Sequence, residues 1–297
     1  SYHNPVLLEE SLAGLEINPD GVYVDATFGG GGHSRAILAQ LSERGKLYAF
    51  DQDEAAWQNE IEDPRFVLIR ENFQFMQQFL RFHGQKEVDG ILADLGVSSH
   101  QFDQAERGFS TRFEGVLDMR MNQKQVLTAR EVVNRYAEEE LARIFHLFGE
   151  LRSSRAMAKA IVEARALGPI ETTTALNTVL KPFLNGFYDH KILAQVYQAI
   201  RIEVNSEMQV IESLLAQVPS MLKPGGRLVV IAYHSLEDRL VKNFIRAGRF
   251  SGEAEKDMYG NTEVPLKKVG GLVVPSPAEI SRNNRARSAK MRIAEKK

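Results

Sequence analysis

Four short apolar runs, each followed by a polar or helical pattern, constrain the fold of this chain more than any other feature. The runs are continuously apolar rather than alternating, which is typical of strands buried on both faces of a sheet. Helical patterns such as residues 34–41 and 54–61 lie between them. This order predicts a parallel α/β sheet. The four runs read "GVYVDATF", "KLYAFDQD", "RFVLIREN" and "VDGILADLGVSS".

The pattern changes after Ser99, where mostly helical periodicity begins, as in "AEEELARIFHLF" and "RAMAKAIVEARALG". A further helix is expected from about residue 192 to 222. It leads into "LKPGGRLVVIAYHSLEDRLVKNFI", which reads as a turn, a buried strand and a helix, before a polar loop region. We therefore predict a helical domain, residues 103–189, inserted into a sheet domain formed by residues 1–102 and 190–297.

Composition narrows the class of protein. The 297 residues are 43% hydrophobic, enough for one large domain or two smaller ones. The chain has no cysteine, which excludes disulfides, cysteine-ligated zinc and thiolate catalysis. No apolar run is long enough for a membrane span and no secretory leader is visible, so we expect a cytoplasmic protein without a membrane partner. The histidines form no close-spaced ligand pair, and no metal is expected.

The stretch "YVDATFGGGGHSRAI" places four glycines between the first strand and a helix. Glycines there allow the backbone to approach a ligand closely, and the helix directs free N–H groups at it. A phosphate-binding P-loop would need Lys and then Ser or Thr after the glycines, whereas His33 and Ser34 follow here. The dinucleotide fingerprint fits better, but Ser34 stands in place of its third glycine.

Acidic residues beside the turn favour a different ligand. Asp25 and Asp94 each end a strand, so both lie at the carboxyl edge of a parallel sheet, where ligands bind. Two anions there repel a pyrophosphate and suit a cation such as S-adenosylmethionine, which has no phosphate. Asp51 ends the next strand and suits the ribose hydroxyls of either cofactor. That Asp25 simply caps the turn remains an alternative.

Eight ordered blocks from His3 to Glu295 resemble the MraW-type methyltransferases. The resemblance implies a Rossmann-like class I methyltransferase sheet with S-adenosylmethionine as cofactor. It also implies methylation of the exocyclic amine (N4) of a cytidine in small-subunit (16S) ribosomal RNA, with that RNA, within a ribosomal particle, as partner. The blocks are "HNPVLLEE", "DATFGGGGHS", "DGILADLGVSS", "ERGFS", "LDMRM", "YQAIRIEVNSE", "GGRLVVIAYHSLEDR" and "NRARSAKMRIAE".

The resemblance also implies which residues contact the cofactor. The backbone of the glycine turn is expected to lie against the methionine portion of the cofactor. Asp51 is expected to accept hydrogen bonds from the ribose hydroxyls, and Phe73 is expected to face the adenine. A core position for Phe73, and a plain helix start for His33, remain alternatives. The implied contacts are Gly31, Gly32, His33, Asp51, Phe73, Asp94 and Gln101.

The missing cysteine also bears on the reaction. Methylation of a cytosine ring carbon normally begins with a thiolate, so a nitrogen or oxygen acceptor remains. An exocyclic amine attacks the sulfonium methyl directly when held in line, and an oriented group accepts its proton. Asp94, the backbone carbonyls after it and His234 are the candidates. His234 and Ser235 alternatively form a loop network with Glu237 and Asp238. In many amino-methyltransferases an aromatic residue that holds the base follows the acidic residue at the position of Asp94. The sequence "DLGV", which begins at Asp94, has no such aromatic residue.

Basic charge is concentrated at the C-terminus. Residues 282–297 hold seven Lys or Arg and one Glu, whereas the whole chain has a net charge of −2. We expect this tail to contact RNA phosphates, so that its deletion weakens RNA binding and leaves cofactor binding intact. We expect the helical insertion, residues 103–189, to be an RNA-recognition domain. Arg152, Arg155 and Lys159 share one face of a helix in it and offer a second basic surface, or a merely solvated one. The RNA-binding candidates in the tail are Arg282, Arg285, Arg287, Lys290 and Arg292.

Two departures from the family pattern concern RNA docking. Gln195 replaces an arginine, and Asn284 replaces a proline. Three other functions remain as alternatives: a methyltransferase of the same fold acting on a protein or small molecule, a dinucleotide-dependent oxidoreductase, and a non-enzymatic RNA-binding module.

Overall fold

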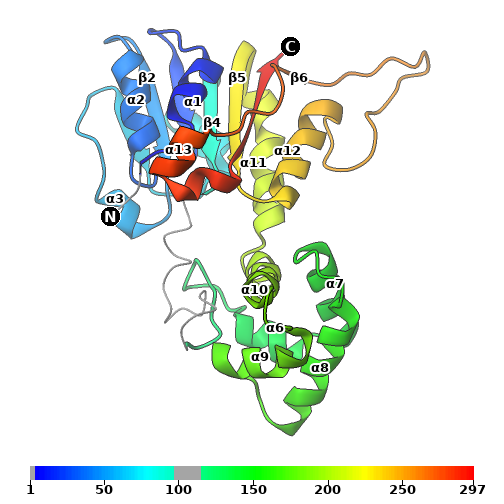
Figure 1. Cartoon of the computed structure of the whole chain (residues 1–297). Helices are drawn as coiled ribbons and strands as arrows, with labels where there is room; N and C mark the ends of the chain where they lie inside the picture. The colour runs from blue at the N-terminus through cyan, green and yellow to red at the C-terminus, as the bar shows by residue number, and fades with distance from the viewer. Residues whose placement is uncertain (1–3, 97–114) are drawn as a thin grey trace. The chain divides into compact units, whose positions relative to one another are not determined.

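The computed structural model describes residues 4–96 and 115–297 (Figure 1). The chain divides into two compact units, one formed by residues 1–97 and 209–297 and the other by residues 98–208. The first unit contains the sheet and the second is helical. Among the described helices, none has the length and apolar character needed to cross a membrane.

The described residues of the first unit form a seven-stranded sheet in the order β3-β2-β1-β4-β5-β7-β6. The strands from β3 to β5 in this order are parallel, whereas β7 runs antiparallel to both of its neighbours. The four strands predicted in the first hundred residues are confirmed as β1 to β4. The strands are β1 (Val22–Asp25), β2 (Lys46–Phe50), β3 (Phe66–Ile69), β4 (Val88–Asp94), β5 (Leu222–Ala232), β6 (Leu266–Lys268) and β7 (Lys290–Lys296).

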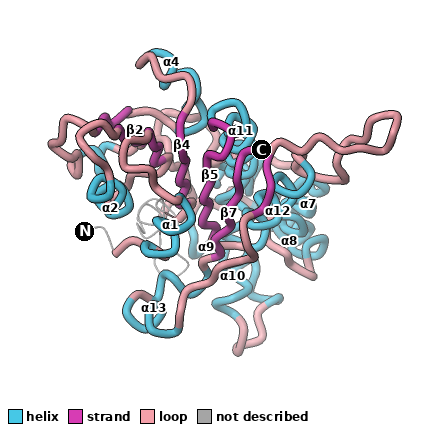
Figure 2. The backbone as a smooth tube through the Cα atoms, turned by 90° about the horizontal axis from the view of Figure 1, so that it is seen from above, coloured by secondary structure: helices cyan, strands magenta, loops and turns pink. Residues whose placement is uncertain are grey.

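Helices cover both faces of this sheet (Figure 2). One face carries α1 and α2, and the other carries α11 and α12. The first helix packs closely, because a Cβ atom on Gly14 would lie 2.9 Å from Cδ1 of Ile293. The helices of this unit are α1 (Leu8–Leu15), α2 (Gly32–Gln40), α3 (Glu54–Trp57), α4 (Met76–Phe82), α11 (Glu207–Met221, whose first residues belong to the helical unit), α12 (Ser235–Ala247) and α13 (Pro277–Arg282).

The helical unit has its own apolar core. Buried residues from every helix of the unit contribute, among them Val132, Phe145, Ile161, Leu176 and Val196. Side-chain caps fix the first residues of two of these helices. The hydroxyls of Thr128 and Thr172 accept hydrogen bonds from the N–H groups of Glu131 and Ala175. The helices are α6 (Ala129–Arg135), α7 (Glu138–Leu147), α8 (Ser154–Leu167), α9 (Thr173–Leu180) and α10 (Asp189–Val204).

The second domain boundary differs from the one expected from the sequence. Residues 190–208 belong to the helical unit and not to the sheet domain, because α10 buries Leu193, Val196 and Ile200 in the helical core. The single helix expected over residues 192–222 is likewise two helices. The side-chain amide of Asn205 donates to the carbonyl of Arg201, which ends α10.

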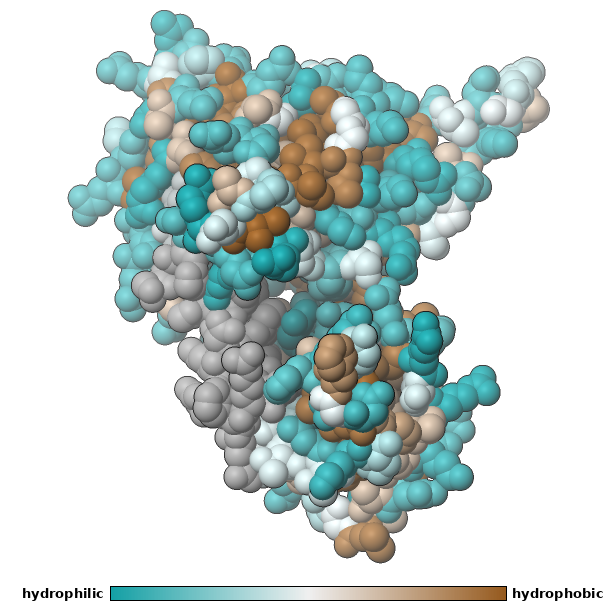
Figure 3. Space-filling model, in the orientation of Figure 1, coloured by the Kyte–Doolittle hydropathy of each residue, from teal (hydrophilic) through white to brown (hydrophobic). Residues whose placement is uncertain are grey.

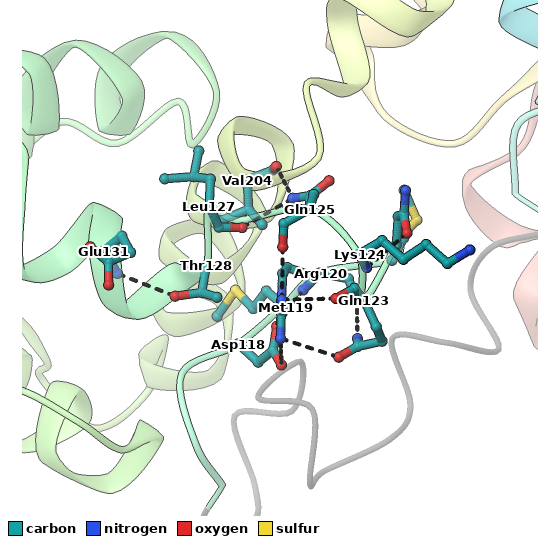
Figure 4. A network of polar contacts seen from close by, with 12 residues as sticks. Asp118, Met119, Arg120, Gln123, Lys124, Gln125, Leu127, Thr128, Glu131 and Val204 are labelled. Carbon is teal, nitrogen blue, oxygen red and sulfur yellow. Dashed lines mark hydrogen bonds and ion pairs between the residues drawn. The ribbon is translucent and has the colours of Figure 1, made fainter.

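Two of the family-like blocks, "LDMRM" and "YQAIRIEVNSE", meet in the helical unit (Figure 4). The guanidinium of Arg120 donates to both carboxylate oxygens of Asp118, at 2.7 and 3.1 Å, and to the carbonyl of Gln125 at 2.8 Å. The amide of Gln125 in turn donates to the carbonyl of Val204 at 2.7 Å. Asn205 accepts the N–H of Met121 at 2.8 Å. These contacts join the segment to the end of α10, which indicates a structural role for the block.

We expect Arg120→Ala to destabilise the helical unit by about 1–3 kcal/mol, because it leaves the partly buried carboxylate of Asp118 without its bidentate donor. Arg120→Lys keeps the charge but not the fork, so it should recover only part of the loss. Urea unfolding of the full chain measures the effect. Equal unfolding midpoints for Arg120→Ala and the natural chain would contradict it.

The viewed face of the molecule is mostly hydrophilic, with smaller hydrophobic patches between (Figure 3). Exposed large apolar side chains occur in both units, for example Phe82 and Leu272 in one and Leu167 and Phe187 in the other. Phe187 packs edge to face on Tyr188 with ring centroids 4.8 Å apart.

Candidate functional site

The glycine turn joins β1 to α2 at the carboxyl edge of the sheet. Gly31 has a φ of 82°, and a Cβ atom there would lie 2.7 Å from the guanidinium of Arg35. Gly32 opens the helix, and its added Cβ would lie 2.8 Å from the Pro5 ring. The turn therefore requires glycine at both positions, and it brings the first N–H groups of α2 to the edge where a ligand binds.

Asp25 is tied into this turn. Its carboxylate accepts the hydroxyl of Ser34 at 2.6 Å and the N–H of Thr27 at 3.1 Å. Burial raises the pKa of the Asp25 carboxyl, and His33 and Ser34 oppose that rise. These contacts support the alternative that Asp25 caps the turn. Ser34, which stands where the dinucleotide fingerprint has its third glycine, donates the hydrogen bond that holds the Asp25 carboxylate in place.

Asp94 ends β4 and gathers several groups around its buried carboxylate. Its own N–H donates to the hydroxyl of Thr27 at 2.7 Å, and its Oδ1 accepts the N–H of Gly96 at 3.1 Å. The Tyr233 hydroxyl also donates to it. Burial raises the pKa of the Asp94 carboxyl, with His33 acting against that rise. Burial likewise raises the pKa of the Tyr233 phenol, so the phenol stays a donor.

His33 faces Asp94 across this cluster, with Nδ1 lying 3.9 Å from the nearer carboxylate oxygen. Its Nε2 lies 2.9 Å from the carbonyl of Val6. A carbonyl only accepts hydrogen bonds, so Nε2 carries a hydrogen, and Nδ1 is the ring nitrogen that faces Asp94. The sequence prediction placed both residues in one site, and the structure brings them together.

Asp51 follows β2 and binds back to the glycine turn. Its two carboxylate oxygens accept the N–H of Gly29 at 2.8 Å and the N–H of Asp53 at 2.9 Å. Burial raises the pKa of the Asp51 carboxyl to about 6, although both backbone donors lower it. Among the described residues each oxygen accepts one hydrogen bond, so each has a second lone pair with which to accept a further donor.

Phe73 lies beyond the end of β3, the strand beside β2, in a short 3-10 helix (Phe73–Phe75). Asn72 caps this helix by accepting the N–H of Gln74 at 2.7 Å, and the amide of Gln217 donates to the Phe73 carbonyl at 3.2 Å. The ring is only partly buried, which favours a ligand-facing position over the core alternative. Gln101 lies outside the described residues.

His234 stands between β5 and α12. Among the described residues, neither ring nitrogen has a hydrogen-bond partner, and Nε2 lies 3.4 Å from the Glu237 carboxylate. Glu237 itself accepts the N–H of Tyr233 at 2.9 Å. Asp238, expected in the same loop network, donates its N–H to the His234 carbonyl at 3.1 Å, while its carboxylate pairs with Arg292. Nε2 of His234 therefore faces Glu237, while Nδ1 has no partner among the described residues, and a catalytic role for His234 stays a prediction.

The C-terminal segment forms part of the sheet, whereas its predicted contact with RNA phosphates stays a prediction. Residues 290–296 form β7, paired on one side with β5 and on the other with β6, and are not a free basic tail. Arg292 donates to both carboxylate oxygens of Asp238, at 2.7 and 3.0 Å. Lys290 and Arg285 are partly buried, whereas Arg282 and Arg287 are exposed. Arg292 thus pairs with an acid of α12, and the one acid of the segment, Glu295, pairs with Arg227 of β5 and Lys267 of β6.

The sheet order, the glycine turn after β1 and the acidic residue after β2 define a class I S-adenosylmethionine-dependent methyltransferase. A comparison with family models makes this specific. The chain belongs to the MraW methylase family, whose model matches residues 1–297.

Relatives match over nearly the whole chain. The chain is 61% identical over 295 residues to a protein of Christiangramia forsetii named ribosomal RNA small subunit methyltransferase H, covering 99% of this chain and 98% of that protein. A Flavobacterium johnsoniae protein of the same name is 62% identical with the same coverage. Among solved structures, an rRNA methylase from Streptococcus thermophilus is 14% identical with a TM-score of 0.41, covering 100% of this chain and 99% of that one.

Proposed function

We propose that this protein transfers the methyl group of S-adenosylmethionine to the exocyclic N4 amine of a cytidine in small-subunit ribosomal RNA. The observation that carries the proposal is the acidic edge of the sheet, where Asp51 and Asp94 flank a glycine turn without a phosphate-binding lysine. The names of the full-length relatives support the RNA substrate. We infer that the RNA is bound within a ribosomal particle, and that the enzyme is cytoplasmic.

The residues present fit this cofactor. Asp51 would accept hydrogen bonds from the ribose hydroxyls, and Phe73 would face the adenine. The backbone of the turn at Gly31 would lie against the methionine portion. The buried carboxylate of Asp94 offers negative charge to a cationic ligand, because burial leaves it poorly compensated. When bound, the cofactor supplies an electrophilic methyl group on a sulfonium.

In the transfer, a bond forms between the cytidine N4 atom and the methyl carbon while the carbon–sulfur bond breaks, and the amine then loses one proton. The chain's part is to hold the amine in line and to accept that proton. We propose the carbonyls that follow Asp94, or His234, as the acceptor, and Asp94 itself as the alternative that its Asn variant tests. The absence of cysteine supports a nitrogen acceptor over a ring carbon.

Direct tests separate this function from its alternatives. Calorimetry should detect binding of S-adenosylmethionine and none of NAD, because the two carboxylates repel a pyrophosphate. Mass spectrometry of ribosomal RNA from a strain lacking the protein should show one unmethylated cytidine amine, restored by the natural gene. Binding of NAD alone would support the oxidoreductase. An unchanged RNA with a methylated protein or small molecule would support a different acceptor.

Cofactor affinity should depend on pH through Asp51. Ribose hydroxyls donate to the ionised carboxylate, and the pKa of about 6 means that this form is lost as the pH falls through 6. We expect the Kd to be constant above pH 7 and to rise about tenfold between pH 7 and 5. Asp51→Asn should weaken binding by about 1–3 kcal/mol at pH 7.5 and remove this pH dependence. Calorimetry across the range measures both, and a pH profile retained in Asp51→Asn would assign it to another group.

A further inference from the structure

One peptide unit near the start of the chain contacts two side chains that are far apart in the sequence. It is the amide between Val6 and Leu7, called the linking peptide below. Its carbonyl oxygen lies 2.9 Å from Nε2 of His33, and its N–H donates to Oε2 of Glu279 at 2.8 Å. The two groups of a trans peptide are fixed in one plane, so a displacement at one of them moves the other. The linking peptide therefore couples α13 to the first turn of α2.

The backbone of Leu7 is held in a conformation that this residue type rarely adopts. Its φ of 51° and ψ of 42° lie in the left-handed region, and its side chain is fully buried. A residue other than glycine keeps such a conformation only where its surroundings hold it there. The hydrogen bond from its N–H to Glu279 is one such restraint. We therefore expect the linking peptide to shift when that bond is lost.

Glu279 is itself fixed by its position in α13. It lies three residues after Ser276, the N-cap of the helix, whose hydroxyl accepts the Glu279 N–H at 3.1 Å. In a capping box, a Glu at this position returns its carboxylate to the N-cap N–H. Here Oε2 of Glu279 accepts the N–H of Leu7, which is 272 residues away in the sequence. The cap thus holds the backbone of Glu279, while its carboxylate holds the N-terminal segment.

The orientation of the His33 ring matters because of Asp94. While Nε2 of the ring bonds to the Val6 carbonyl, Nδ1 lies 3.9 Å from Oδ2 of Asp94. A rotation of the ring that breaks the first contact also changes the second. Burial raises the pKa of the Asp94 carboxyl, and His33 opposes that rise. The position of the ring therefore affects the negative charge that the site offers to a cationic ligand.

We propose that Glu279 is a positioning residue for the cofactor site, which acts on His33 through the linking peptide. The inference rests on the proposed function, because it takes His33 and Asp94 as parts of an S-adenosylmethionine site. It gives a role in that site to a residue of α13, a helix on which none of the proposed cofactor contacts lies.

Two substitutions of Glu279 separate the reach of its side chain from its charge. Glu279→Gln keeps the length and an acceptor oxygen but loses the charge, whereas Glu279→Asp keeps the charge on a shorter side chain. A charge effect is the competing explanation. Burial raises the pKa of the Tyr233 phenol, and the charge of Glu279 adds to that rise, so this charge also acts on a residue beside Asp94.

Cofactor affinity is the first readout. In Glu279→Asp the shorter carboxylate no longer reaches the Leu7 N–H, so the Kd for S-adenosylmethionine should rise about fivefold. Glu279→Gln keeps the bond and should stay within about twofold of the natural Kd. Calorimetry of the full chain measures both. The control Glu263→Ala removes an exposed carboxylate of the same unit and should leave the Kd unchanged.

The second readout follows His33 itself. In the full chain labelled with ¹⁵N-histidine, the exchange of the His33 Nε2 proton with water reports its bond to the Val6 carbonyl. The signal is assigned by its absence from His33→Gln. Glu279→Asp should speed this exchange at least about tenfold, because the linking peptide no longer holds its carbonyl in place. A purely structural role of Glu279 would lower the melting temperature without changing this exchange in the folded protein.

The outcomes separate this inference from the proposed function. A higher Kd and faster His33 exchange in Glu279→Asp, with recovery of both in Glu279→Gln, support the positioning role. An unchanged Kd or an unchanged exchange rate in Glu279→Asp overturns it while the natural chain still binds the cofactor. Glu279→Gln that binds as weakly as Glu279→Asp, or more weakly, also overturns it and assigns the effect to charge. A natural chain that does not bind S-adenosylmethionine overturns the proposed function and, with it, any role at a cofactor site.

Discussion

Deletion of residues 282–297 is expected to abolish the native fold and, with it, S-adenosylmethionine binding. β7 lies between β5 and β6, and its six register pairs with β5 cover one side of that strand. Met291 and Ala294 are fully buried in the core. The deletion would also leave Asp238 without Arg292 and Arg227 without Glu295. A domain is stable by only roughly 5–15 kcal/mol, so the loss of a central strand with its buried side chains and ion pairs is expected to unfold the sheet unit.

Calorimetry and circular dichroism of the truncated chain measure this outcome. We expect no cooperative unfolding transition of the sheet unit and no heat of cofactor binding. The matched control is Arg282→Ala with Arg287→Ala, which removes two exposed charges of the same segment and should keep the natural melting temperature. A truncated chain that melts cooperatively near the natural temperature and binds the cofactor would restore the tail interpretation.

The strands β1 to β4 were predictable because each is a continuous apolar run followed by a turn or helix signal. β7 was not, since its sequence "KMRIAEK" carries four charged residues in seven and only Met291 and Ala294 are fully buried. Its charges are satisfied by partners far away in sequence, such as Asp238 and Arg227. A local pattern cannot show pairing of that kind, so a sheet strand resembles a basic tail.

The acidic positions of the site were predictable for a topological reason. Parallel strands end at one edge, so Asp25, Asp51 and Asp94 had to lie near one another. Their partners were harder to predict. Tyr233 follows β5, and the pairing of Asp94 with Ile231 in the neighbouring strand places it beside Asp94. Placing Tyr233 beside Asp94 requires the register between β4 and β5, which cannot be read from the sequence.

Asp94→Asn is expected to weaken S-adenosylmethionine binding at least tenfold while leaving much of the methylation rate at saturating cofactor. The variant keeps Oδ1 as an acceptor for the Gly96 N–H but removes the charge that a cationic ligand meets. The Tyr233 hydroxyl also loses a charged acceptor. Both losses act on the bound cofactor, so they should appear in the Kd more than in the rate.

Single-turnover methylation at saturating cofactor separates this role from proton acceptance. The Asp94 carboxylate already accepts from Gly96 and from Tyr233, so taking a proton from the substrate would disrupt contacts that hold the end of β4. We therefore expect a rate within about threefold of the natural enzyme, well short of the roughly hundredfold that a positioned acid or base contributes. A rate that stays at least tenfold low at saturation would make Asp94 the proton acceptor. A recovered rate directs the search to the carbonyls after Asp94 and to His234, whose two ring nitrogens have no hydrogen-bond partner among the described residues.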